Sequence, residues 1–132
     1  MDRRQFLCLA GSGLWGCAAA VSYQGQLRDG RVLIGLADLA AALSAKGYAL
    51  VQAAGLDDPI LIYRTGEGAY RALSARCTHL GCQVRPARHA LICPCHGSSF
   101  SWEGAVLRGP AQQALRQFRV EAKEDVLEIT VD

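Results

Sequence analysis

Two short segments, each containing cysteine and histidine, constrain this chain more than any other feature. Residues 77–82 read CTHLGC and residues 93–98 read CPCHGS. Four of the six cysteines and two of the three histidines in the chain lie in these segments. Such clustering in a small domain indicates a bound metal, a disulfide, or both.

Each segment offers one thiolate and one imidazole to a shared metal centre. The candidate ligands are Cys77 and His79 in the first segment and Cys93 and His96 in the second. Soft thiolates suit an iron–sulfur core, whereas neutral imidazole is a weaker donor. Replacing two thiolates by imidazoles removes two negative charges near one iron, so the reduced state is less penalised and the reduction potential rises.

A zinc site is the main alternative, because two cysteines and two histidines are also a zinc ligand set. Zinc fingers usually pair cysteine with cysteine and histidine with histidine along the chain, whereas each segment here supplies one of each. Zinc also leaves the second cysteine pair and the sequence at 97–100 unexplained. A domain held by two disulfides leaves His79 and His96 unexplained. His89, between the segments, is interpreted as a solvated turn residue.

The two segments resemble the signature of the Rieske [2Fe–2S] proteins, in the form that has two extra cysteines. The resemblance covers residues 45–132 and includes a candidate proline loop at 109–111. It implies one [2Fe–2S] cluster, with two thiolates on one iron and two imidazoles on the other: Cys77 and Cys93, and His79 and His96.

The resemblance also implies roles for residues around the cluster. Cys82 and Cys95 would form a disulfide between the two cluster loops. Ser98 matches a serine whose hydroxyl bonds a bridging sulfide, and Phe100 stands where quinol-oxidising members have a tyrosine that bonds a cysteine ligand. Lacking that hydroxyl, the chain is expected to have an intermediate-to-high potential, below that of respiratory members. Further residues expected near the cluster are a shielding leucine, two turn glycines and a proline: Leu80, Gly81, Gly97 and Pro110.

The N-terminus, residues 1–21, is predicted to be an export signal. Paired arginines precede an apolar, uncharged stretch at 6–21, which resembles a twin-arginine signal. The stretch has 16 residues, short of the roughly 20 that a spanning helix needs. An uncleaved membrane anchor is the alternative. The sequence at 14–17 also resembles a bacterial lipobox, which makes Cys17 a candidate lipidation site.

The rest of the chain is predicted to form a polar linker at 22–31 and an all-β domain at 32–132. An aspartate cap, an alanine-rich interior and a glycine stop predict one short helix over 38–47. Short strands are predicted at 48–53, 59–64, 70–74, 90–93 and 99–102, with a hairpin turn at 65–68. Alternating apolar residues predict a C-terminal hairpin with its turn at 123–125. Such short strands favour a Rieske-type antiparallel sandwich or small barrels, with a loop subdomain for the cluster.

The charge pattern and the motifs favour an electron carrier. The 14 basic and 12 acidic residues form no long runs, so nucleic acid is not an expected partner. The sequence shows no conventional catalytic triad, phosphate loop or acid–base carboxylate pair. The resemblance implies c-type or b-type cytochromes or a quinol as partners, which dock where His79 and His96 meet solvent. Export would place the chain in the periplasm or on the outer side of the cytoplasmic membrane, where the N-terminus could provide membrane association.

The alternative is an iron–sulfur subunit of a larger enzyme. Candidates are a quinol–cytochrome c oxidoreductase and an oxidase such as arsenite oxidase, and oxidoreductase activity would then belong to the complex. The respiratory subunit normally has a clear membrane helix, a hinge and a larger insertion between the motifs. This chain is short on all three and has Phe100, so a stand-alone carrier is favoured.

Overall fold

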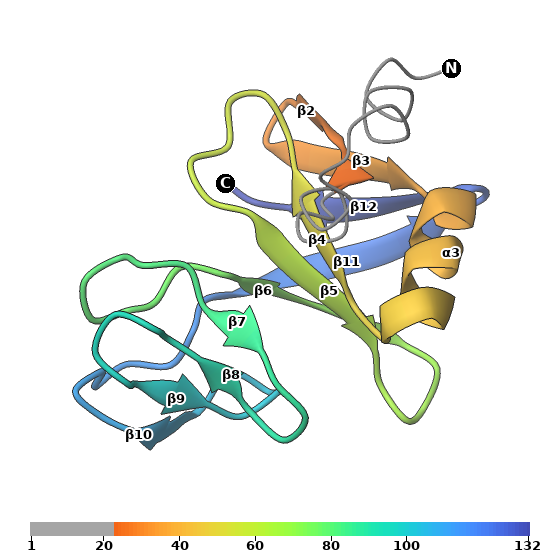
Figure 1. The fold of residues 1–132 in the computed structure, drawn as a ribbon. Helices are drawn as coiled ribbons and strands as arrows, with labels where there is room; N and C mark the ends of the chain where they lie inside the picture. The colour runs from red at the N-terminus through yellow and green to blue at the C-terminus, as the bar shows by residue number, and fades with distance from the viewer. Residues whose placement is uncertain (1–22) are drawn as a thin grey trace, which may run out of the picture.

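The computed structural model describes residues 23–132, which form two β-sheets and one helix (Figure 1). The larger sheet contains eight strands: β1 (Tyr23–Gln24), β2 (Gln26–Arg28), β3 (Arg31–Gly35), β4 (Ala49–Gln52), β5 (Ile60–Arg64), β6 (Tyr70–Ser74), β11 (Gln117–Lys123) and β12 (Val126–Thr130). The smaller sheet contains four: β7 (Arg85–Pro86), β8 (Leu91–Ile92), β9 (Ser99–Phe100) and β10 (Val106–Arg108). The helix is α3 (Leu36–Lys46). The predicted all-β class with one short helix is confirmed.

The smaller sheet is an insertion between two neighbouring strands of the larger one. The order in the larger sheet is β1-β4-β5-β6-β11-β12-β3-β2, and in the smaller sheet it is β10-β9-β8-β7. Because β6 and β11 pair with each other, the chain leaves the larger sheet and returns to it at one place. We call residues 76–116 the lobe, and residues 23–75 and 117–132 the body. Figure 1 shows the lobe projecting to one side of the body.

The body is built around alternating strands, as the sequence predicts for its C-terminal hairpin. Leu127 and Ile129 on β12 are fully buried, and Glu128 between them is not. Strand β3 pairs with β12 and buries Val32 and Ile34 in the same way. Each such side chain contributes about 1.5–3 kcal/mol by leaving water. Helix α3 adds its buried face to this core.

Helix α3 begins before the aspartate that the sequence suggested as its cap. Gly35 is the N-cap, with extended backbone and no side-chain hydrogen bond. Asp38 lies instead in the first turn, where its carboxylate interacts favourably with the helix dipole. Gly47 ends the helix at φ 87°, and its N–H donates to the carbonyl of Leu43 at 2.8 Å. A left-handed residue at this position favours glycine, so the predicted stop is confirmed.

The predicted linker at 22–31 is wrong for the residues that the structure describes. Strand β1 pairs in parallel with β4, and β2 pairs with β3 through a turn in which Asp29 and Gly30 have positive φ. Tyr23 and Leu27 pack against the body core. The segment is mostly polar because these are edge strands, which bury only alternate residues.

The predicted export signal, 1–21, and the lipidation candidate Cys17 lie outside the described residues. Within residues 23–132, no helix combines the length and apolar character that crossing a membrane requires.

Candidate metal centre

The first predicted ligand segment forms a tight loop between β6 and β7. The N–H of Cys77 donates to the carbonyl of Cys82 at 2.7 Å, and the N–H of Gly81 donates back to the carbonyl of Cys77 at 3.0 Å. Gly81 has φ 84°, in the left-handed region. Only glycine adopts this conformation at little cost, which explains the glycine before Cys82.

The second segment, between β8 and β9, repeats this backbone pattern. The N–H of Cys93 donates to the carbonyl of Ser98 at 2.8 Å, and the N–H of Gly97 donates to the carbonyl of Cys93 at 3.0 Å. Gly97 has φ 81°. The two loops therefore hold Cys77 and Cys93 at matching backbone positions, whereas the histidine follows two residues later in the first loop and three residues later in the second.

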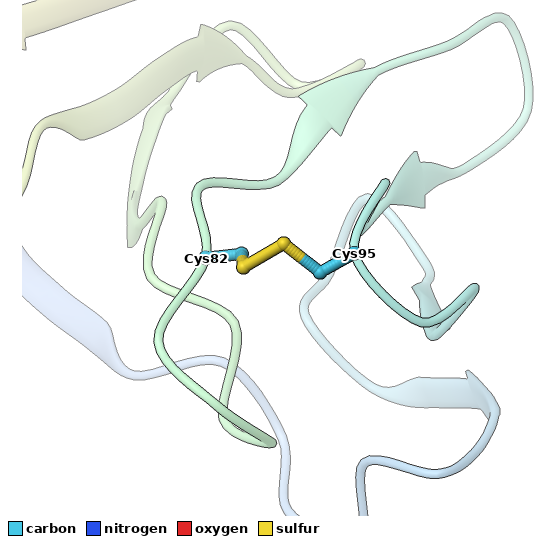
Figure 2. Close-up of a disulfide and its surroundings, with 2 residues drawn as sticks. All are labelled: Cys82 and Cys95. Carbon is cyan, nitrogen blue, oxygen red and sulfur yellow. A yellow bond between two sulfur atoms is a disulfide. The ribbon is translucent and has the colours of Figure 1, made fainter.

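A disulfide joins the two loops. Figure 2 shows it bridging from Cys82 in the first loop to Cys95 in the second. The Cα atoms of the two cysteines are 6.5 Å apart. The structure thus contains the disulfide that the resemblance implied. The Sγ atoms of Cys82, Cys93 and Cys95 all lie within 4.8 Å of one another. Because two of these sulfurs are bonded to each other, the group shows the disulfide packing beside the Cys93 thiol.

The two cysteines left free among the described residues, Cys77 and Cys93, lie side by side in the lobe core. They are 1 % and 2 % exposed. Burial raises the pKa of the Cys77 thiol, and a hydrogen bond with Cys93 also raises it. The backbone N–H groups of His79 and Leu80 hydrogen-bond the same sulfur and lower its pKa. Loading such a pair with iron must therefore release protons, because thiolates are the ligands.

The two histidines of the motifs also converge. The ring centroids of His79 and His96 lie 5.2 Å apart, with the rings nearly perpendicular at 89°. Nδ1 of His79 is buried and has no hydrogen-bond partner among residues 23–132. An unpaired buried nitrogen is costly, so this atom fits a position in which it binds a metal. His96 is exposed, so the imidazole side of the site reaches the surface.

The donor set fits an iron–sulfur cluster. Two buried thiols lie on the core side and two imidazoles toward solvent, and the disulfide closes the site from one flank. Soft thiolates combined with imidazoles match the ligand preferences of a mixed-ligand cluster. The structure therefore brings together all four predicted ligands.

The predicted proline loop contacts the second cluster loop through a hydrogen bond. The N–H of Ala111 donates to Oγ of Ser98 at 3.0 Å, and Ser98 is fully buried. Since Oγ acts as the acceptor in this bond, its own proton is left for another partner. Pro110, in a cis peptide with Gly109, is exposed.

Sequence reasoning missed a matching contact to the first loop. Thr78 donates from Oγ1 to the carbonyl of Gln113 at 2.6 Å, so the first cluster loop is held by Gln113, two residues beyond the Ala111 that holds the second. Thr78 lies inside the CTHLGC segment but is not a ligand, and its partner is 35 residues away. Nothing in the local sequence connects the two.

Two more interactions around the loops were also missed. Tyr63 on β5 donates its hydroxyl to the carbonyl of Trp102, and their rings pack edge to face with centroids 5.2 Å apart. Arg76 forms an ion pair with Asp58 at 3.4 Å. A Cβ at Gly81 would come within 2.9 Å of the Arg76 guanidinium, so this side chain lies directly against the first loop.

The remaining predicted neighbours occupy different environments. Phe100 is fully buried in the same apolar cluster as Cys77 and Cys93. Leu80, beside His79, is 63 % exposed. Its expected shielding of the cluster stays a prediction.

Comparison with known proteins agrees with this geometry. The family profile of the Rieske [2Fe-2S] domain matches residues 37–119, which include both loops. The cytochrome b6-f complex iron-sulfur subunit of Chlorobaculum tepidum is 34% identical over 77 residues, which cover 57% of this chain and 42% of the subunit. The chloroplastic subunit of Volvox carteri is 42% identical over 74 residues, covering 53% of this chain and 36% of the subunit. The chain thus spans less than half the length of these relatives.

Solved structures show a similar fold over about three quarters of the chain. The crystal structure of the cyanobacterial plasma membrane Rieske protein PetC3 from Synechocystis PCC 6803 superposes with a TM-score of 0.62 at 31% identity, covering 74% of this chain and 97% of that one. Naphthalene 1,2-dioxygenase superposes with a TM-score of 0.60 at 19% identity, over 77% of this chain and 26% of that one, and so shares the fold alone. The chain therefore belongs to the Rieske [2Fe–2S] domain family, and it carries a single [2Fe–2S] cluster.

Proposed function

We propose that this chain is a one-electron carrier, with Cys77 and Cys93 binding one iron through Sγ and His79, through Nδ1, and His96 binding the other. The observation that carries the proposal is the convergence of two buried thiols and two imidazoles, with Nδ1 of His79 buried and unpaired. When bound, the cluster takes up and releases single electrons.

The surrounding residues determine how easily the site accepts negative charge. The N–H groups of His79 and Leu80 point at the Cys77 sulfur, and Ser98 has a buried hydroxyl proton to donate. Donors aimed at cluster sulfurs stabilise the reduced state and raise the potential. The apolar packing around Phe100 keeps water away from the thiolate side.

The exposed imidazole side is the route by which electrons enter and leave. His96 is exposed, and His79 lies beside it. A partner touching these rings comes within contact distance of two ligands of one iron. The expected partners are a c-type or b-type cytochrome or a quinol.

Histidine variants test the ligand assignment, because the chain offers a matched control. His79→Ala and His96→Ala should each lose the cluster, measured as iron and acid-labile sulfide per chain and as visible absorbance. His89→Ala, in the exposed turn between the loops, should retain it. Full cluster content in either of the first two variants would exclude that histidine as a ligand.

Membership of a larger quinol-oxidising complex is the second candidate function. It is favoured by relatives that are named as iron-sulfur subunits of cytochrome b6-f complexes. Oxidoreductase activity would then belong to the complex and not to this chain alone. Mild detergent extraction followed by affinity purification tests it: co-purifying b-type haem in stoichiometric amount supports the subunit, and a free chain supports the carrier.

Export by the twin-arginine pathway to the periplasmic side is proposed from the sequence of residues 1–21. Replacing both arginines, Arg3→Lys with Arg4→Lys, should leave the chain in the cytoplasm. Mass spectrometry of the exported chain distinguishes a lipid on Cys17 from a cleaved or retained N-terminus.

A further inference from the structure

Charge is distributed unequally between the lobe and the body. The lobe, residues 76–116, has five arginines and one glutamate, a formal charge of +4. The described body has seven basic and ten acidic residues, a formal charge of −3. The small net charge of the whole chain therefore combines a basic lobe, which contains the cluster site, with an acidic body.

The one acidic residue of the lobe lies toward the body. Burial raises the pKa of Tyr63 on β5, and the carboxylate of Glu103 is near enough to add to that increase, against the opposing charge of Arg71.

The register of the smaller sheet defines which residues share a face. Cross-strand partners point to the same side of a sheet. One row faces the lobe core, where Leu91 and Phe100 are fully buried: Pro86, Leu91, Phe100 and Val106. The other row faces outward: Arg85, Ile92, Ser99 and Arg108.

This outward row has the composition of a docking surface. Ile92 is 41 % exposed at its centre, and Leu107, in the irregular register beside Arg108, is 59 % exposed. Within residues 23–132, the large exposed apolar side chains are these two and Leu80, all in the lobe. Arg85 and Arg108 lie on the two edge strands, about 14 Å apart at the usual spacing between strands.

The arginines of this row are free to bind a partner. Among the described residues, Arg76 pairs with Asp58, and Arg116 donates to a backbone carbonyl of the body. Arg85 and Arg108 are exposed and form no ion pair within residues 23–132. An apolar centre rimmed by unpaired arginines is typical of small, transient protein interfaces.

We propose, on the basis of the electron-transfer function proposed above, that an acidic redox protein docks on the outer patch formed by Arg85, Ile92, Leu107 and Arg108. Strands β8 and β9, which carry the centre of this patch, are also the strands that hold the second cluster loop. The patch therefore continues directly into that loop, because Ile92 precedes Cys93 in the chain. The complementary surface has carboxylates around an apolar centre.

A protein partner fits this patch better than a membrane surface. Binding to anionic lipid typically needs a cluster of about four to eight basic residues. The outer patch has two arginines separated by the width of the sheet and by apolar side chains. That spacing matches a ring of carboxylates on a folded partner.

The test compares two charge reversals of equal size in the full, cluster-loaded chain. Arg85→Glu with Arg108→Glu changes the patch, and Arg28→Glu with Arg119→Glu makes the same change in net charge on exposed strand positions of the body. The measurement is the stopped-flow rate of electron transfer to an acidic cytochrome c, from about 10 mM to about 1 M ionic strength. Circular dichroism and cluster absorbance establish that each variant is folded and loaded.

We expect the patch reversal to slow association about tenfold at low ionic strength and the body reversal to change it little, with the difference lost at high salt. Equal effects of the two reversals would overturn the proposal, because net charge alone would then explain them. Binding to phosphatidylglycerol vesicles that the patch reversal abolishes and the body reversal leaves intact would overturn it in favour of a membrane surface. Loss of electron transfer in every version, including the unmodified chain, would count against the electron-carrier function itself.

Discussion

The fully buried hydroxyl of Ser98 accepts a hydrogen bond from the backbone N–H of Ala111 at 3.0 Å, which fastens the second cluster loop to the proline loop. The oxygen of Ser98 thus supports the loop, and its proton is left for another partner, which we propose is a cluster sulfide.

Replacement of Ser98 should change both the free energy of unfolding and the midpoint potential. In Ser98→Ala the N–H of Ala111 loses its acceptor, which should lower the free energy of unfolding by about 1–3 kcal/mol. Loss of the hydroxyl donor should also lower the midpoint potential by some tens of millivolts. Denaturant unfolding and redox titration measure the two effects. Ser99→Ala, on the outward row of β9, is the control, and a Ser98→Ala potential equal to that of the unmodified chain would contradict the donor role.

Phe100→Tyr tests whether a hydroxyl at position 100 raises the midpoint potential by donating a hydrogen bond to a cysteine ligand. Phe100 is fully buried in the cluster of side chains that contains Cys77 and Cys93, so an added hydroxyl can donate to a cysteine ligand. The midpoint potential should rise by tens of millivolts in a redox titration. Phe118→Tyr makes the same change in the body and should leave the potential unchanged. No change, or a fall, in Phe100→Tyr would refute the assignment.

The disulfide should stabilise the cluster loops more than the body. Cys82 and Cys95 are 13 residues apart, and closing a loop of this length contributes about 3 kcal/mol in the chain-entropy description. Replacing both cysteines by serine should shorten the lifetime of the cluster, followed by its visible absorbance in mild denaturant. If cluster loss is as slow in the double variant as in the unmodified chain, the disulfide does not hold the loops.

The Tyr63 hydroxyl should stabilise the contact between lobe and body in a pH-dependent way. Tyr63→Phe removes the donor to the Trp102 carbonyl and should lower the free energy of unfolding by about 0.5–1.5 kcal/mol. Burial raises the pKa of Tyr63 above 10.0, so the neutral donor form is the one that folding favours. The stabilisation is therefore fully present below pH 10 and is lost as the pH rises through the higher folded-state pKa.

Denaturant unfolding of Tyr63→Phe and of the unmodified chain, at neutral pH and above pH 10, measures this effect. Tyr48→Phe is the matched control, because Tyr48 packs against Trp102 with ring centroids 6.1 Å apart, and its hydroxyl forms no hydrogen bond within residues 23–132. A stability difference between Tyr63→Phe and the unmodified chain that stays constant across this pH range would contradict the hydrogen-bond account.

The ligand set could be predicted from sequence because each half of it is local. When a cysteine and a histidine lie within four residues of each other, the sequence alone indicates that both can bind the same metal centre. The contacts that support the site are not local: Thr78 reaches Gln113, and Tyr63 reaches Trp102. Thr78 and Gln113 meet because the lobe folds back on itself, and Tyr63 and Trp102 meet because the lobe packs against the body.

The same distinction between local and non-local signals explains which strands could be predicted from the sequence. Strand β12 buries every second residue, so its pattern is visible in the sequence. Strands β7 and β10 have two and three residues and exist because β8 and β9 offer them edges to pair with. The sequence of strands β1 and β2 is typical of a linker for the same reason, since their pairing with β4 and β3, and not their composition, makes them strands.

The most direct test of the account is EPR of the reduced, full-length chain together with metal analysis. Ligation by His79 and His96 predicts two iron atoms per chain and a rhombic signal with a low average g, in which nitrogen couplings from two imidazoles are resolved by pulsed methods. Stoichiometric zinc with no reduced-state signal, or a signal without nitrogen coupling, would contradict a histidine-ligated [2Fe–2S] cluster at this site.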